Sequence, residues 1–196
     1  MWNNSQIMAT LARHRRSRSR RVLFTPLVAM LFVALAMPAR AEPNDVEARV
    51  KAAFLYNFVR FVEWPPDSLG DARTPVVIGI VGRDPLGSAL DAIIDGKTLD
   101  GHPIRIRRFD SIEQVDHCQV LFIADPKRAK TLRQLLAGKA ILSVGDYAGA
   151  LQDGNVIACR LVDDSVRFEI SLETAGRAGL KISSQLLKAA LNSPGR

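Results

Sequence analysis

The chain has 196 residues, of which 47% are hydrophobic and 24% are charged, and its formal net charge is +7. This composition excludes wholesale disorder, because it supplies enough apolar side chains to build a core. Nucleic-acid binding is also disfavoured, because the excess charge lies in the first 41 residues, which contain seven arginines and no acidic residue. The remaining 155 residues carry 20 basic and 20 acidic side chains, so they lack the basic character of a nucleic-acid-binding domain.

Residues 1–41 have the three parts of a secretory signal peptide. A basic segment ends at Arg20-Arg21, an apolar stretch covers residues 22–37, and Ala39-Arg40-Ala41 offers small residues for cleavage. The apolar stretch is shorter than the roughly 20 residues of a transmembrane helix. We therefore expect a cleaved leader followed by one exported domain over residues 42–196. The arginine pair also resembles a twin-arginine signal, but ordinary secretion is favoured because nothing downstream demands folded export with a cofactor.

The exported part is expected to begin with a helix that runs to about Trp64 and stops at Pro65-Pro66. Its apolar residues form two stripes, whereas a helix that buries one face needs only one. Two interpretations stay open: the helix is sandwiched inside the domain, or its second face awaits a partner. The stripes consist of Val46, Val50, Ala53, Phe54, Asn57, Phe58, Phe61 and Trp64 on one side, and Leu55, Val59 and Val62 on the other.

Short apolar segments then alternate with helical ones. We predict strands at residues 76–81, 104–109, 120–124 and 140–144, and helices at residues 85–94 and 127–136. This alternation is typical of a mainly parallel sheet flanked by helices on both faces, a Rossmann-like α/β arrangement. Strands at residues 156–162 and 166–172, separated by Asp163-Asp164-Ser165, predict a terminal antiparallel hairpin. An amphipathic covering helix over residues 173–191 completes the predicted domain.

Both cysteines, Cys118 and Cys159, fall in the exported part, where an oxidising compartment permits a disulfide. A predicted strand separates them, however. If the three strands lie side by side, the outer two are about 9–10 Å apart, whereas the Cα atoms of a disulfide lie within about 7 Å. A disulfide or redox pair and two separate buried thiols both stay open.

Metal-binding and catalytic patterns are not found in the sequence. His102 lies in a predicted turn, and His117 beside Cys118 provides two possible ligands where zinc takes three or four. No nucleophile elbow, paired-histidine zinc motif or phosphate-loop lysine motif is present. We therefore predict no enzyme activity, no metal and no cofactor.

Two segments resemble anion-binding sites but have simpler explanations. The glycine-containing turn at residues 79–87 follows a strand and opens a helix, a position that can bind anions, yet Asp84 would repel a phosphate there. Arg105, Arg107 and Arg108 cluster on one predicted strand, where arginines guard an exposed edge. We therefore expect no nucleic-acid partner.

Several segments, taken together, resemble the YfiR family of periplasmic regulators. The similarity covers nearly the whole exported part in order and is most specific in its last two segments, although Ser171 stands where the family pattern has Asn. The segments are residues 50–65, 78–82, 118–123, 142–146, 166–172 and 178–187.

The resemblance implies an α/β domain that is exported to the periplasm and is often dimeric. It implies a partner too: the periplasmic part of an inner-membrane diguanylate cyclase, which the family holds inactive, so that loss of the restraint raises cyclic di-GMP and favours biofilm growth. Family cysteines are implicated in stability and redox response, and this chain has Cys118 and Cys159 alone.

On this interpretation the aromatic first helix supplies the contact, with Tyr56, Phe58 and Trp64 as candidate anchors, because aromatic residues dominate interface energetics. The alternative is a periplasmic small-ligand binding module coupled to a membrane sensor or transporter. Such a module would use the crevice that parallel sheets offer at the carboxyl ends of their strands.

Overall fold

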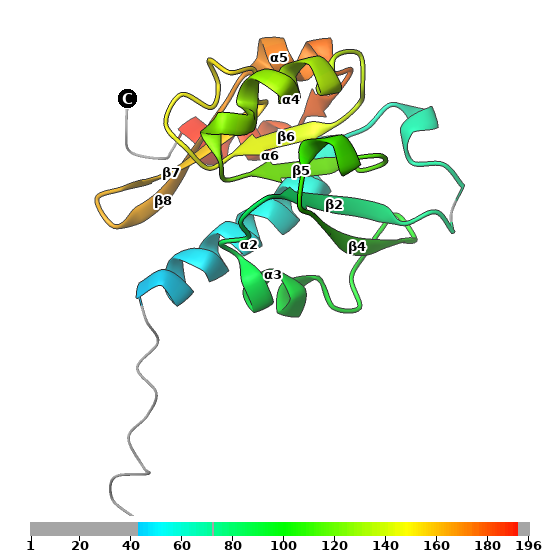
Figure 1. The fold of residues 1–196 in the computed structure, drawn as a ribbon. Coiled ribbons are helices and arrows are strands. Elements are labelled where there is room, and N and C mark those ends of the chain that lie inside the picture. The colour runs from blue at the N-terminus through cyan, green and yellow to red at the C-terminus, as the bar shows by residue number, and fades with distance from the viewer. Residues whose placement is uncertain (1–42, 72, 192–196) are drawn as a thin grey trace, which may run out of the picture. The chain divides into compact units, whose positions relative to one another are not determined.

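A seven-stranded sheet lies at the centre of the described domain, with strands in the order β3-β4-β2-β5-β6-β7-β8 (Figure 1). The computed structural model describes residues 43–71 and 73–191, so the expected leader over residues 1–41 lies outside the described residues. The strands are β2 (Val76–Val81), β3 (Thr98–Leu99), β4 (His102–Phe109), β5 (Val120–Ile123), β6 (Leu142–Gly145), β7 (Ile157–Val162) and β8 (Ser165–Ile170).

The inner strands are parallel and both edge strands are antiparallel. β4, β2, β5, β6 and β7 pair in parallel, and β8 pairs with β7 as a hairpin. The mainly parallel sheet with a terminal hairpin is therefore confirmed. Asp163 and Asp164 have φ values of 49° and 55°, which suits the two-residue turn of a tight hairpin. The strand β3, which is not among the predicted strands, reaches β4 through a similar turn at Asp100-Gly101.

Helices cover both faces of the sheet, as predicted. They are α2 (Pro43–Phe61), α3 (Gly87–Ile94), α4 (Ala129–Leu136), α5 (Leu172–Arg177) and α6 (Ser184–Leu191), with short 3-10 turns at Pro66–Ser68, Ile112–Gln114 and Pro126–Arg128. Figure 1 shows α2 and α3 on one side of the sheet and α4 on the other. We call these sides the α2 face and the α4 face.

Each face has its own hydrophobic core, because successive strand residues point in opposite directions. Ile78 and Phe122 belong to the core of the α2 face, together with residues of α2, α3 and α6. Val77 and Leu121 belong to the core of the α4 face, together with Leu135 and Leu136 of α4. The continuous apolar strands of the sequence are therefore explained by burial on both sides.

The predicted single helix over residues 173–191 is wrong, because the structure divides it into α5, the short strand β9 (Lys181–Ile182) and α6. Gly179 adopts a φ of 69°, which ends α5 in the way glycine commonly ends helices. A Cβ atom at Gly179 would lie 3.3 Å from the ring of Pro65. The glycine therefore serves both the turn and a close approach between distant segments.

The first helix is also shorter than predicted, since α2 ends at Phe61 and not at Trp64. The chain continues into β1 (Val62–Glu63), which pairs antiparallel with β9. The backbone N–H of Ser183 donates to the carbonyl of Phe61 at 3.0 Å. This two-stranded pairing ties the end of the first helix to the start of the last one.

Candidate functional site

The three aromatic residues predicted as partner contacts occupy different environments. Phe58 is fully buried, with its ring centroid 5.0 Å from that of Phe168 in β8. Its side chain is therefore part of the core of the α2 face and has no surface to offer a partner. Tyr56 and Trp64 are half-buried and pack against the rim of the same core, so part of each residue stays accessible.

Arg60 extends this rim. Its guanidinium carbon lies 5.7 Å from the ring centroid of Tyr56 and 5.6 Å from that of Phe61, within cation–π distance of both. We call Tyr56, Arg60 and Phe61 the α2 aromatic surface. Tyrosine and arginine are enriched at the centres of protein interfaces, so this surface combines the residue types and the exposure that partner binding requires.

Trp64 follows this surface in the connection after β1. Its indole Nε1 is buried and has no hydrogen-bond partner in the part of the chain that the structure describes. A buried indole N–H normally finds a partner, so Trp64 has an unused donor beside the predicted contact region. Whether a partner protein contacts Tyr56 and Trp64 stays a prediction.

An ion pair anchors α2 to the end of the parallel sheet. Lys51 is 8% exposed, and its Nζ lies 2.7 Å from both carboxylate oxygens of Asp146, which directly follows β6. Glu47 contributes a further oxygen at 2.5 Å. Burial alone would lower the pKa of Lys51, but the hydrogen bonds and charges of Asp146 and Glu47 outweigh burial and raise it. Lys51 is therefore a charged anchor and not a catalytic base.

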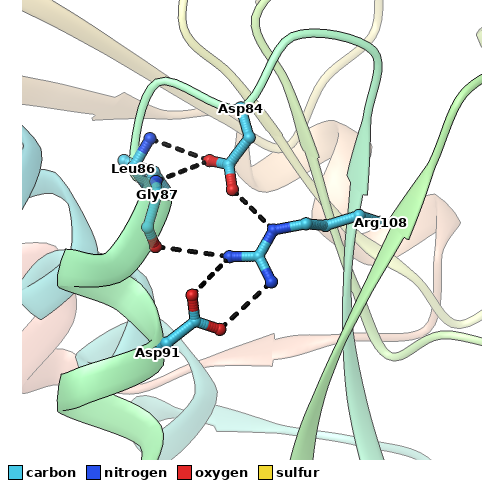
Figure 2. A network of polar contacts seen from close by, with 5 residues as sticks. All are labelled: Asp84, Leu86, Gly87, Asp91 and Arg108. Atoms are coloured by element: carbon cyan, nitrogen blue, oxygen red, sulfur yellow. Dashed lines mark hydrogen bonds and ion pairs between the residues drawn. The ribbon is translucent and has the colours of Figure 1, made fainter.

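The glycine-containing turn between β2 and α3 is closed by its own side chains (Figure 2). Asp84 accepts hydrogen bonds from the backbone N–H groups of Leu86 and Gly87 at 2.8 and 3.0 Å. Those amides are the groups that an anion would use at a helix start. The structure thus gives a physical reason for the expectation that this turn holds no phosphate: a carboxylate already occupies the position.

Arg108 of β4 completes the same network. Its Nε donates to Asp84 at 2.7 Å, and its two terminal nitrogens donate to Asp91 of α3 at 3.1 and 2.8 Å. Burial alone would raise the pKa of Asp84, but the hydrogen bonds from Arg108 and from the two amides lower it below its usual value. Arg107 is likewise paired, with Asp116 at 2.6 Å. These arginines serve the fold.

Cys118 and Cys159 are free thiols on opposite faces of the sheet. β6 lies between the strand that follows Cys118 and the strand that contains Cys159, as the sequence analysis assumed. The arrangement favours the alternative of two separate buried thiols over a disulfide. Burial raises the pKa of each thiol to about 12, so neither is a thiolate near neutral pH.

A cavity of about 490 Å³ lies at the far end of the α4 face, between the end of α4, β6 and α5. Leu136, Ile141 and Val156 give it an apolar wall, while Ser143 and Arg177 add polar groups. The volume is in the range of small-molecule sites. This cavity is the feature most relevant to a small-ligand function.

The described residues offer little else to chemistry. Nowhere in residues 43–71 and 73–191 do three or more His, Cys, Asp or Glu side chains gather in a way that could hold a metal ion. His102 is buried, and its Nδ1 lies 2.9 Å from the carbonyl oxygen of Thr74, so it braces a loop. His117 is exposed. Within the same residues, every helix is too short or too polar to cross a bilayer.

Sequence reasoning missed Arg60, Lys51 and Asp146. Arg60 follows Tyr56 by four residues, which places both on one face of a helix, so this pair was detectable. Lys51 stands out as a lone charge within the apolar segment of α2, but its partner Asp146 is 95 residues away. Only the fold brings that pair together.

Comparison with known proteins places the chain in a family. No curated protein sequence matches it. A family model described as YfiR/HmsC-like matches residues 48–191, which includes the whole sheet, the α2 aromatic surface and both cysteines. Members of this family are regulators, not enzymes, and act in the periplasm on cyclic di-GMP signalling. The chain therefore belongs to the YfiR/HmsC-like family.

Proposed function

We propose that the chain is a non-catalytic periplasmic regulator that binds and represses the periplasmic part of an inner-membrane diguanylate cyclase and so lowers cyclic di-GMP. Family membership over residues 48–191 is the observation that carries this proposal. Action by contact is supported by two features: the polar clusters brace the fold, and the α2 aromatic surface, with Arg60 exposed and both rings half-buried, has the composition of a protein interface.

Repression needs no chemistry from this chain. A binder that prefers the inactive conformation of the cyclase shifts the conformational equilibrium by its differential affinity for the two states. The α2 aromatic surface is suited to such a role because it is held on a rigid base. Phe58, two residues after Tyr56, points into the core and packs between Phe54 and Phe168. The half-buried rings of Tyr56 and Phe61 pack against the same core, so they lose little freedom on binding.

The test compares two exposed arginines of the same helix, Arg60 and Arg49. Arg60→Glu removes the cation between the rings, whereas Arg49→Glu makes the same charge change outside the α2 aromatic surface. Tagged protein is captured from cross-linked membranes, and the diguanylate cyclase retained is measured together with cellular cyclic di-GMP. We expect Arg60→Glu to weaken binding about tenfold or more and to raise cyclic di-GMP, and Arg49→Glu to change neither.

Two results would count against this proposal. If the unaltered protein retains no diguanylate cyclase, the partner is wrong. If Arg60→Glu and Arg49→Glu change cyclase retention and cyclic di-GMP equally, the cyclase binds elsewhere on the chain.

The cavity of the α4 face favours a second candidate, a small-ligand binding module coupled to a membrane sensor or transporter. Thermal unfolding in the presence of a metabolite panel separates the two candidates. Stabilisation by one compound, lost when Val156→Trp fills the cavity, together with no captured cyclase, would favour the second candidate.

A further inference from the structure

The two edges of the sheet differ in what they present to the outside. At one edge the short strand β3 pairs with the first two residues of β4, and the rest of β4 carries the exposed residues Arg105, Arg107 and Arg108. Charged side chains on an edge disfavour pairing with another strand. At the other edge lies β8, a six-residue strand without proline, which alternates charged and apolar residues. Edge strands are natural templates for pairing unless they are blocked.

The hairpin geometry shows which backbone groups β8 presents at this edge. Val162 and Ser165 flank the two-residue turn, which makes them a hydrogen-bonded pair. The N–H of Ser171 also donates to the carbonyl of Val156 at 2.8 Å, in phase with this assignment. Ser165, Arg167 and Glu169 therefore direct their backbone groups toward β7. The backbone N–H and C=O groups of the alternate residues point outward from the sheet edge. These residues are Val166, Phe168 and Ile170.

The side chains of β8 alternate in the same way. Phe168 lies in the core of the α2 face, so Arg167 and Glu169 project on the α4 face. Arg160 of β7 stands directly opposite Arg167, an unfavourable pairing of like charges, and it forms its ion pair with Glu169. Arg167 has no carboxylate partner in the described part of the chain, and its buried Nε has no hydrogen-bond partner there.

We propose that the edge of β8 is a self-complementary interaction surface that joins two copies of this chain, with Phe168 of each copy opposite Phe168 of the other. In this antiparallel register the outward backbone groups of Val166 meet those of Ile170 in the second copy. Arg167 then stands directly opposite Glu169 of the second copy, and the same pair recurs by symmetry. Arg167 thereby gains a carboxylate partner, which the described part of its own chain does not supply.

Charge selects this register among those that keep the backbone hydrogen bonds. A shift by two residues in one direction would place Arg167 opposite Arg167 of the second copy. A shift in the other direction would place Glu169 opposite Glu169 of the second copy. Both alternatives bring like charges together across non-hydrogen-bonded pairs, where side chains are closest. On the α2 face the proposed register aligns apolar residues throughout, so the two sheets become continuous. This inference is independent of any cyclase partner.

A charge exchange tests the proposal with purified protein, measured by sedimentation over a range of concentrations. Arg167→Glu and Glu169→Arg each place like charges opposite one another twice, and each should weaken the dimer about tenfold or more. The double variant Arg167→Glu/Glu169→Arg restores opposite charges and should recover most of the affinity. Arg105→Glu, a similar change at the other edge, should leave the dimer unaltered.

A second measurement reports the register itself. Arg167→Cys protein mixed with Glu169→Cys protein should form a disulfide-linked pair, because non-hydrogen-bonded partners lie about 4.5 Å apart. Either variant alone should not, and the native thiols are buried and give little background. In the dimer the amides of Val166, Phe168 and Ile170 should also exchange hydrogen slowly, because they donate hydrogen bonds to the second copy in this register. A monomer at every concentration, or a dimer unaffected by both single charge changes, would overturn the proposal.

Discussion

The two halves of α2 share one helix but differ completely in their surroundings. In the second half Ala52, Leu55, Phe58 and Val59 are at most 1% exposed, and residues from both predicted stripes are buried together. In the first half Val46 and Val50 are 55% and 37% exposed. Figure 1 shows these first turns projecting from the body of the domain. The sandwiched interpretation therefore describes the second half alone.

The difference teaches that one helix with two apolar stripes can have two environments along its length: one half is packed in the core, and the other half is exposed. Lys51 marks the boundary, because it is the last residue before the buried segment and its ion pair with Asp146 fixes the helix to β6. On the N-terminal side of Lys51, Val46 and Val50 continue the apolar stripe, and no part of the described chain covers them. We therefore expect substitutions in the second half to lower the free energy of unfolding, and substitutions in the first half to change it little.

The largest expected effect comes from Phe58→Ala. Removing this fully buried ring leaves a cavity among Phe54, Phe168 and the sheet, and should cost about 3–5 kcal/mol of the free energy of unfolding. Val50→Ala, on the same stripe two turns earlier, is the matched control and should cost about 0.5 kcal/mol or less. Urea unfolding compares the two. Equal losses would show that both halves are packed alike and would remove the contrast.

Lys51→Met should have the next largest effect, about 3 kcal/mol, because it leaves the nearly buried carboxylate of Asp146 without its cation. Lys51→Met/Asp146→Leu removes both charges and should recover most of the loss. The pH dependence follows from the raised pKa of Lys51. Its contribution is fully present below the ordinary value of 10.5 and is lost as pH rises through the raised pKa, so stability should fall in alkaline solution, and less so in Lys51→Met.

Thiol alkylation shows where such a variant opens. Cys159 shares the α2-face core with Phe58, whereas Cys118 lies on the other face. Loosening of α2 should expose Cys159 first, and its alkylation rate should rise more than that of Cys118. Equal increases in the alkylation rates of Cys118 and Cys159 would mean that the loss of Lys51 loosens the whole domain and not α2 alone.

Local patterns predicted the sheet well, because each signal lies within a few residues. The apolar runs of β2, β5 and β6 and the Asp163-Asp164 turn of the hairpin depend on neighbours in sequence. The same patterns led the sequence analysis to join α5 and α6 into one helix, although Gly179 offered a local stop signal. Besides its positive φ, the glycine at this position allows a close approach to Pro65, a contact across more than a hundred residues.

The candidate site was predicted only in part, for a related reason. Helical periodicity finds that Tyr56 and Phe58 belong to a doubly apolar helix, but it cannot tell which ring is covered. That depends on Phe168, which the hairpin brings against α2 from the far edge of the sheet. Burial of Phe58 and exposure of Arg60 therefore follow from the tertiary fold and not from the helix itself.

The smallest expected effect is that of Val46→Ser/Val50→Ser. Serine and valine have similar helix propensities, and both side chains are substantially exposed, so the free energy of unfolding should change by about 0.5 kcal/mol or less. The measurement is urea unfolding at two protein concentrations. A larger loss that grows with protein concentration would mean that a second copy covers these valines, because only an associating protein has a concentration-dependent stability. A larger loss that is independent of concentration would instead show that the first half of α2 packs within its own chain.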